Sequence, residues 1–137
     1  AGDICSKDGL DILKNSNLKY IAVFGNNDRE LFQFSEDYNI KKEPYYFKIK
    51  DKSFKLMHLP FHLHPDTDII IFGHTHKFDC EYKNKKLFIN PGEVCAREKP
   101  IISCAKLEIN TNEYIITHYF KNTNENNFMK EEFRYEQ

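Results

Sequence analysis

Residues 68–76, Asp-Ile-Ile-Ile-Phe-Gly-His-Thr-His, constrain the fold more than any other part of the chain. The four consecutive apolar residues predict a strand buried on both faces, because a half-exposed strand alternates with polar residues. Gly73 ends this strand, and His74 and His76 follow it directly. A turn begun at the glycine would aim the two imidazoles at neighbouring points, and imidazole is the commonest metal ligand. The stretch therefore predicts a metal site at a strand end; the alternative is a pair of surface loop histidines.

Length, charge and cysteine content restrict the class of protein. The 137 residues predict one domain, 1–137, with a substantial core. Twenty basic and 21 acidic residues leave a formal charge of -1, which argues against nucleic acid or an anionic membrane as an obligatory partner. No apolar run reaches the length of a membrane span. The four cysteines lack C-x-x-C spacing and are interpreted as reduced core thiols of a cytoplasmic protein: Cys5, Cys80, Cys95 and Cys104.

The first residues, Ala1-Gly2-Asp3-Ile4, are typical of a strand that is just ending in a turn with a carboxylate. They contain neither an initiator methionine nor a signal peptide. We therefore expect the chain to be incomplete at its N-terminus.

Helical and strand patterns alternate in the first part of the chain. Ser6 is predicted to cap a short helix anchored by Leu10, Ile12 and Leu13. A buried strand is predicted at 20–24, followed by Gly25-Asn26-Asn27-Asp28. Asp28 is expected to cap a helical turn through residues 31–34 or to support the neighbouring site.

From residue 44 the apolar pattern has period two, which predicts antiparallel hairpins. Residues 59–67 are expected to form a loop. No helix or strand is assigned to the polar tail from residue 122. Three hairpins are predicted: 45–50 with 53–58, 78–82 with 87–89, and 101–109 with 114–120.

Polar groups recur at the ends of these apolar segments. Four of the five glycines, at positions 2, 25, 73 and 92, stand there beside a carboxylate, amide or imidazole. Open α/β sheets bind ligands at the carboxyl ends of their strands. Mixed oxygen and imidazole donors suit Mn, Fe or Zn, and two such ions about 3.5–4 Å apart hydrolyse phosphate esters in two-metal sites. The candidate ligands are Asp3, Asn26, His58, His74 and His76.

The ordered series Gly2-Asp3, Gly25-Asn26-Asn27-Asp28, His58 and Gly73-His-Thr-His76 resembles the calcineurin-like metallophosphoesterases. Asn90-Pro91-Gly92 narrows the resemblance to the small YfcE-type phosphodiesterases, to which the retromer subunit Vps29 is also similar. The resemblance implies an α/β fold: a four-layer α/β/β/α sandwich of two mixed sheets, here truncated at its N-terminus.

The resemblance also implies roles for individual residues. Asp3 would bridge two divalent transition ions, with manganese favoured and zinc, iron or nickel as alternatives. Asn26, His58 and His74 would complete one metal shell and act in catalysis through a hydroxide shared by both ions. His76 would bind the other ion, and Asn27 would lie beside a small-molecule phosphate ester.

Three features depart from the family pattern. The Asp-x-His that ends the opening strand in the family is absent, so one ion would lack two ligands. Leu59 follows His58 where the family usually has glycine. Asn27 replaces a histidine that protonates the leaving group in many members, and an amide does no general-acid work at neutral pH.

The sequence leaves other functions and other residue roles open. The main alternative function is a Vps29-like scaffold that keeps the fold without catalysis, and a further one is a metal-free relative. His62 and His64 are expected to face solvent, and His118 is expected to be a packed or edge-strand histidine and not a ligand. Arg29 and Arg97 are weaker candidates for a phosphate contact.

Overall fold

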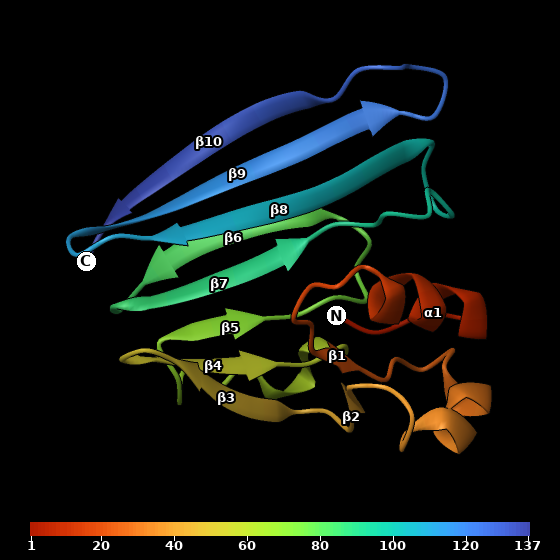
Figure 1. Cartoon of the computed structure of the whole chain (residues 1–137). Helices are drawn as coiled ribbons and strands as arrows, with labels where there is room; N and C mark the ends of the chain where they lie inside the picture. The colour runs from red at the N-terminus through yellow and green to blue at the C-terminus, as the bar shows by residue number, and fades with distance from the viewer. The chain divides into compact units, whose positions relative to one another are not determined.

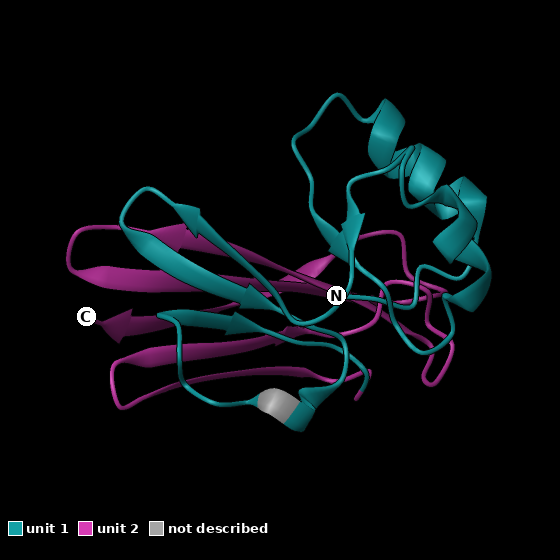
Figure 2. Cartoon of the chain, turned by 90° about the horizontal axis from the view of Figure 1, so that it is seen from below, with its two compact units in different colours: residues 1–74 teal, residues 75–137 magenta. Residues whose placement is uncertain are grey.

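The structure is a computed structural model of the chain, and it describes residues 1–61 and 63–137 in full; of residue 62 it gives only the place in a short helix. The chain divides into two compact units, residues 1–74 and residues 75–137 (Figure 2). The prediction of a single domain stays a prediction.

Unit 1 begins with the predicted helix, α1 (Lys7–Asn15). Ser6 caps it as expected, because its hydroxyl accepts a hydrogen bond from the Gly9 amide at 3.2 Å. Leu10 is fully buried, but Ile12 is 72% exposed and is no anchor. That expectation was wrong because residue 12 projects from the side of the helix opposite residue 10.

The core of the first part of unit 1 surrounds a parallel strand pair. Strand β1 (Ala22–Val23) pairs with β2 (Ile40–Lys41), and the 3₁₀ helix η1 (Arg29–Phe34) connects them. Strand β1 is shorter than the predicted strand 20–24, and β2 was not predicted because its two residues carry no periodic signal. Six buried side chains form the core cluster: Leu10, Ala22, Phe24, Leu31, Tyr38 and Ile40.

The second part of unit 1 contains the predicted hairpin and the buried strand. Strands β3 (Tyr45–Ile49) and β4 (Lys52–Leu56) pair antiparallel, and β4 pairs parallel with β5 (Ile69–Ile71). Ile69 and Ile70 are fully buried, which confirms a strand covered on both faces. The connecting loop includes the short helix η2 (Pro60–His62).

A buried lysine holds this connecting loop. Lys55 on β4 is 1% exposed, and its ammonium donates to the His64 carbonyl at 2.8 Å and pairs with the Asp66 carboxylate. The other oxygen of Asp66 accepts the Tyr46 hydroxyl at 2.8 Å. Because a buried ammonium is costly without partners, these contacts fix the loop against the sheet.

Unit 2 consists of antiparallel strands (Figure 1). Strand β6 (Phe78–Lys83) pairs with β7 (Lys86–Pro91), as predicted. Strands β8 (Ile101–Ile109) and β9 (Glu113–Asn122) form the other predicted hairpin, and β10 (Met129–Glu136) completes a sheet of order β10-β9-β8.

Strand β10 lies in the tail to which no element was assigned. Its apolar signal is carried by Phe133 and Tyr135, two residues apart. The Phe133 ring lies 5.5 Å from Phe78, the Tyr135 ring lies 5.9 Å from Tyr82, and the Tyr135 hydroxyl donates to the Cys80 carbonyl at 3.0 Å. Pairing with β9 therefore forms this strand, and side-chain contacts with residues about 55 positions away hold it.

All four cysteines are free, but the expectation of core thiols was wrong. Cys5, Cys95 and Cys104 are exposed and Cys80 is half-buried. Cys5 and Cys95 lie in loops, and Cys104 alternates with the buried Ser103 on β8, so its thiol faces the opposite side of the strand. In the described part of the chain, no helix is long and apolar enough to cross a membrane.

Replacing the buried lysine tests its role in the loop. We expect Lys55→Met to lower the free energy of unfolding by about 1–3 kcal/mol, because hydrogen bonds of a charged group are lost. Urea unfolding followed by circular dichroism measures this, and limited proteolysis should show faster cleavage within residues 60–67. The exposed Lys48→Met on the neighbouring strand is the control. Equal unfolding energies for the two variants would contradict the role assigned to Lys55.

Candidate metal centre

Three side chains that follow strand ends of unit 1 converge on one point. Asn26 follows β1, His58 follows β4 and His74 follows β5. Nε2 of His58 lies 2.8 Å from Oδ1 of Asn26, and Nδ1 of His74 lies 3.2 Å from each of these two atoms. His58 is buried, whereas Asn26 and His74 are exposed. The cluster is therefore open to solvent on one side.

Asp3 is the fourth member of this cluster. Its Oδ1 lies 3.5 Å from Nε2 of His58. The backbone amide of Asn27 donates to Oδ1 at 2.9 Å, and its side-chain amide donates to Oδ2 at 2.7 Å. Asn27, expected beside the substrate, thus directs its amide at the carboxylate of Asp3.

The protonation of His58 can be read from its neighbours. Nδ1 lies 2.8 Å from the carbonyl oxygen of Ala1, which can only accept a hydrogen bond. Nδ1 therefore carries the proton in the neutral ring, and Nε2 presents a lone pair. This lone pair faces two oxygen acceptors, of Asn26 and Asp3, so the acceptors need between them either a proton, which Nδ1 of His74 at 3.2 Å can supply, or a cation.

The donor spacing fits one divalent transition ion. Metal bonds of about 2.0–2.2 Å at angles of about 90–110° place neighbouring donor atoms about 2.8–3.6 Å apart, and the four separations given above run from 2.8 to 3.5 Å. Among the residues that the structure describes, no three His, Cys, Asp or Glu side chains alone form a ligand group. The fit therefore depends on the amide oxygen of Asn26 as an additional donor.

Glycines allow the loops to approach each other around the cluster. A Cβ atom on Gly25 would lie 2.2 Å from Oδ1 of Asp3, and one on Gly2 would lie 2.6 Å from Nδ1 of His58. A Cβ atom on Gly73 would lie 2.6 Å from the Ala1 carbonyl. In the turn after β5 the positive φ belongs to His74 and not to Gly73.

The backbone is left-handed at three of the five predicted metal ligands. The φ angles are +56° at Asp3, +67° at His74 and +59° at His76. Residues with a Cβ seldom adopt this region, at a cost of about 1–3 kcal/mol each, and such residues cluster at functional sites.

Two carboxylates that carry no metal role hold the loops of the cluster. Asp28 is fully buried and accepts the Gly25 amide at 2.8 Å and the Cys5 amide at 2.7 Å. It makes no side-chain cap on η1, so its role is to support the site. Glu43, which sequence reasoning missed, accepts the backbone amides of His58 and Leu59, the latter at 2.8 Å. An isolated glutamate before a proline gave no signal in the sequence.

His76 belongs to unit 2, and its surroundings are described there. Its Nδ1 lies 3.1 Å from Oε2 of Glu93, and its Nε2 lies 3.5 Å from Nη2 of Arg97. Asn90, fully buried, donates to the Thr75 hydroxyl at 2.8 Å and so supports the turn before His76. Glu93 was missed as a site residue, although it follows Gly92, one of the glycines noted at strand ends.

Glu93 is a buried carboxylate with several donors. Burial by itself raises the pKa of Glu93, but hydrogen bonds from the Cys95 thiol and from the backbone amides of Glu98 and Arg97, together with the electrostatic interaction with His76, outweigh this effect. The pKa of Glu93 is lowered to about 2.

A small pocket of about 190 Å³ in unit 2 adjoins His76 and Glu93 and reaches His118. His118 is packed, as expected: its ring stacks on Phe78 at 3.8 Å, and its Nε2 lies 2.8 Å from the Ser103 hydroxyl. Burial lowers the pKa of His118.

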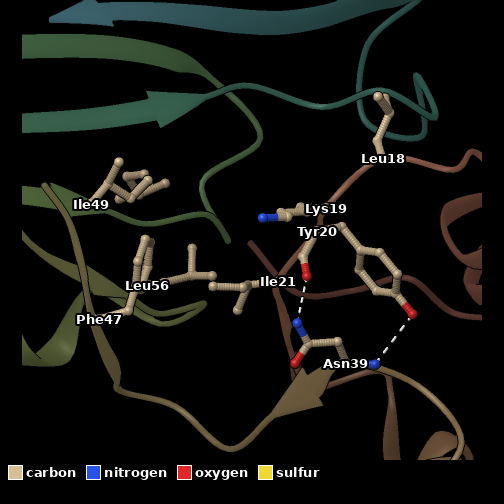
Figure 3. A pocket seen from close by; sticks show the side chains of 9 residues that line it. Leu18, Lys19, Tyr20, Ile21, Asn39, Phe47, Ile49 and Leu56 are labelled. Carbon is tan, nitrogen blue, oxygen red and sulfur yellow. Dashed lines mark hydrogen bonds between the residues drawn. The ribbon is translucent and has the colours of Figure 1, made fainter.

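A larger pocket of about 720 Å³ lies in unit 1 and is mostly apolar (Figure 3). Asn39 and Tyr20 are polar residues in its lining, and the side chain of Asn39 donates a hydrogen bond to the Tyr20 carbonyl at 2.5 Å. None of the predicted metal ligands lines it. Its apolar lining consists of Leu18, Ile21, Phe47, Ile49, Leu56 and Ile71.

Three further residues were considered for the site from the sequence. His64 is exposed, and Arg29 is exposed at the start of η1. The side chain of His62 lies outside the described residues.

Adding one methyl group at Gly25 tests the placement of Asp3. We expect Gly25→Ala to lower the affinity for Zn²⁺ at least about 10-fold, because the new Cβ displaces the carboxylate and disturbed ligand orientation weakens binding by 10–100-fold. Isothermal titration with Zn²⁺ measures the affinity. Gly9→Ala is the matched control, since its Cβ would meet the Ile4 side chain and no ligand. Unchanged affinity in Gly25→Ala would exclude Asp3 from the metal site.

The low pKa of Glu93 predicts a pH-dependent contribution to stability. A folded pKa of about 2, below the ordinary 4.5, gives stability that is present above pH 4.5 and is lost as the pH falls towards 2. Glu93→Gln should therefore be less stable than the parent by roughly 2–3 kcal/mol at pH 6, with the difference shrinking below pH 4. Urea unfolding across this range measures it, and a difference independent of pH would contradict the assignment.

Known proteins match this chain in sequence and in fold. Residues 1–112 match the calcineurin-like phosphoesterase superfamily domain. A phosphodiesterase of Methanocaldococcus jannaschii is 30% identical over 126 residues, which are 82% of this chain and 76% of the relative.

Two solved structures share the fold. Vps29 of Entamoeba histolytica, complexed with Zn²⁺, is 25% identical with a TM-score of 0.70, covering 97% of this chain and 78% of that one. An archaeal phosphodiesterase is 26% identical with a TM-score of 0.64, covering 96% and 79%. These matches confirm the predicted α/β fold of the metallophosphoesterase type and the resemblance drawn from the motif series. The chain belongs to the calcineurin-like phosphoesterase superfamily.

Proposed function

We propose that this protein is a metal-dependent phosphodiesterase or phosphatase. The observation that carries the proposal is the lone pair on Nε2 of His58, which faces the oxygens of Asn26 and Asp3. Converging acceptors are what a cation binds and what a purely structural loop avoids. The phosphodiesterase relative supports the same chemistry.

The ions proposed are two divalent transition metals, with manganese favoured. Asp3, Asn26, His58 and His74 would hold one of them, and His76 would contribute to the other. When bound, such ions neutralise charge on the phosphoryl oxygens and lower the pKa of water.

The residues of the chain itself orient these groups. The Ala1 carbonyl keeps the proton of His58 on Nδ1, and both amide groups of Asn27 hold the carboxylate of Asp3. Because Asn27 is committed to Asp3 and an amide is no general acid, protonation of the leaving group is not supplied from this position. The proposed substrates are therefore small phosphate esters with acidic leaving groups, such as aryl phosphodiesters. No nucleic acid or membrane partner is required, and the free thiols suit a cytoplasmic location.

The second candidate function is a non-catalytic binding module. The similarity to Vps29 favours it, since the fold match there is as extensive as with the phosphodiesterase. That Vps29 structure is complexed with Zn²⁺. Metal binding therefore does not separate the two functions, whereas hydrolysis does.

Removal of His74 separates the enzyme from the binding module. We expect His74→Ala to reduce hydrolysis of an aryl phosphodiester with Mn²⁺ by about 100-fold or more, because a metal donor is lost. The exposed His64→Ala is the control and should retain the parent rate. Stability should change little, since the side chain is exposed at a strand end.

The result that overturns the proposal is equally specific. If the parent protein binds Mn²⁺ but hydrolyses the diester no faster than His74→Ala, the binding module is the better reading.

A further inference from the structure

The carboxylate of Glu93 organises a loop without regular secondary structure. Its Oε1 accepts the Arg97 amide at 2.6 Å and the Cys95 thiol at 2.9 Å, and its Oε2 accepts the Glu98 amide at 3.2 Å. Oε2 also lies 3.1 Å from Nδ1 of His76. Glu93 is 8% exposed. One buried side chain thus joins the loop that carries Arg97 to an imidazole.

The two neighbours of His76 specify the same tautomer. A carboxylate only accepts hydrogen bonds, so Nδ1 beside Glu93 carries a proton. A guanidinium only donates, so Nε2, 3.5 Å from Nη2 of Arg97, presents its lone pair. These two requirements are independent, and both leave Nε2 as the donor atom of the neutral ring.

The arrangement serves more than stability. The contact is made at an energetic cost, because His76 adopts a left-handed backbone, with φ of +59°. A histidine that donates Nδ1–H to a carboxylate and keeps Nε2 unprotonated is the arrangement found around metal-binding histidines. Ser103, His118, Lys77 and Lys99 line the pocket beside the pair, but no hydrogen bond joins the two lysines to His76 among the contacts described.

We propose that Glu93 is a positioning residue: it fixes His76 as the Nδ1–H tautomer, with Nε2 presented to a divalent metal ion, and anchors the backbone that brings Arg97 to the same ring. The inference rests on the proposed function only in taking His76 as a metal ligand. The tautomer itself follows from Glu93 and Arg97 whether or not the protein hydrolyses phosphodiesters.

Nitrogen-15 NMR of the imidazoles in the metal-free protein at about pH 9 tests the tautomer. We expect Nδ1–H at His76 in the parent and in the control Glu98→Ala, whose side chain is exposed on the same loop. Glu93→Ala should shift His76 towards Nε2–H, and Glu93→Gln should largely restore the parent signal because its amide oxygen still accepts. Nε2–H at His76 in the parent, or an unchanged signal in Glu93→Ala, would overturn the proposal.

Metal binding gives the second measurement. Titration with Zn²⁺ should show weaker binding in Glu93→Ala, by about 10–100-fold for the ion that involves His76, with recovery in Glu93→Gln. Should Glu93→Ala not fold, Glu93→Asp replaces it, since the shorter side chain withdraws the carboxylate from Nδ1. Equal Zn²⁺ affinity in the parent and in these variants counts against the proposal. Absence of phosphodiester hydrolysis in the parent would remove the proposed function and leave the tautomer result standing.

Discussion

The hydrogen bond between Nδ1 of His58 and the carbonyl of Ala1 is the interaction on which the candidate metal centre depends. In the neutral ring it leaves the lone pair on Nε2, where the oxygens of Asn26 and Asp3 meet it as acceptors. The loops approach each other closely at this bond, since a Cβ atom at Gly2 would collide with the His58 ring. Without this bond, His58 could take the other tautomer and donate to Asn26, and the cluster would need no cation.

A hydrogen-bond acceptor also fixes the tautomer of a histidine in unit 2, where the acceptor is a buried carboxylate instead of a backbone carbonyl. Glu93 holds Nδ1 of His76, as Ala1 holds Nδ1 of His58. Both units also rely on left-handed residues with side chains, at His74 and at His76. Such backbones are costly, so they persist only because hydrogen bonds from buried partners such as Asn90 support the neighbouring residues.

The distinction between enzyme and binding module lies in how the cluster is used. The fold is shared by a phosphodiesterase and by Vps29, so the fold does not decide the function. The open side of the cluster, formed by the exposed Asn26 and His74, is where a phosphate ester could approach the metal. A binding module gains nothing from that opening, which is why the loss of activity on removing His74 is the informative experiment.

Local patterns in the sequence determined α1, the three hairpins, the buried strand β5, the family and the identity of the candidate ligands, because capping, period two and short motifs act over a few residues. Only the tertiary structure decided which atoms face each other. The roles of Glu43 and Glu93, the support that Asp28 gives to two loops, and strand β10 all depend on partners distant in the chain or on loop conformation. The exposure of the cysteines was likewise decided by which side of a strand or loop faces the core. Sequence periodicity carries no information on such pairings, because a hydrogen bond between loops depends on where the whole fold places them.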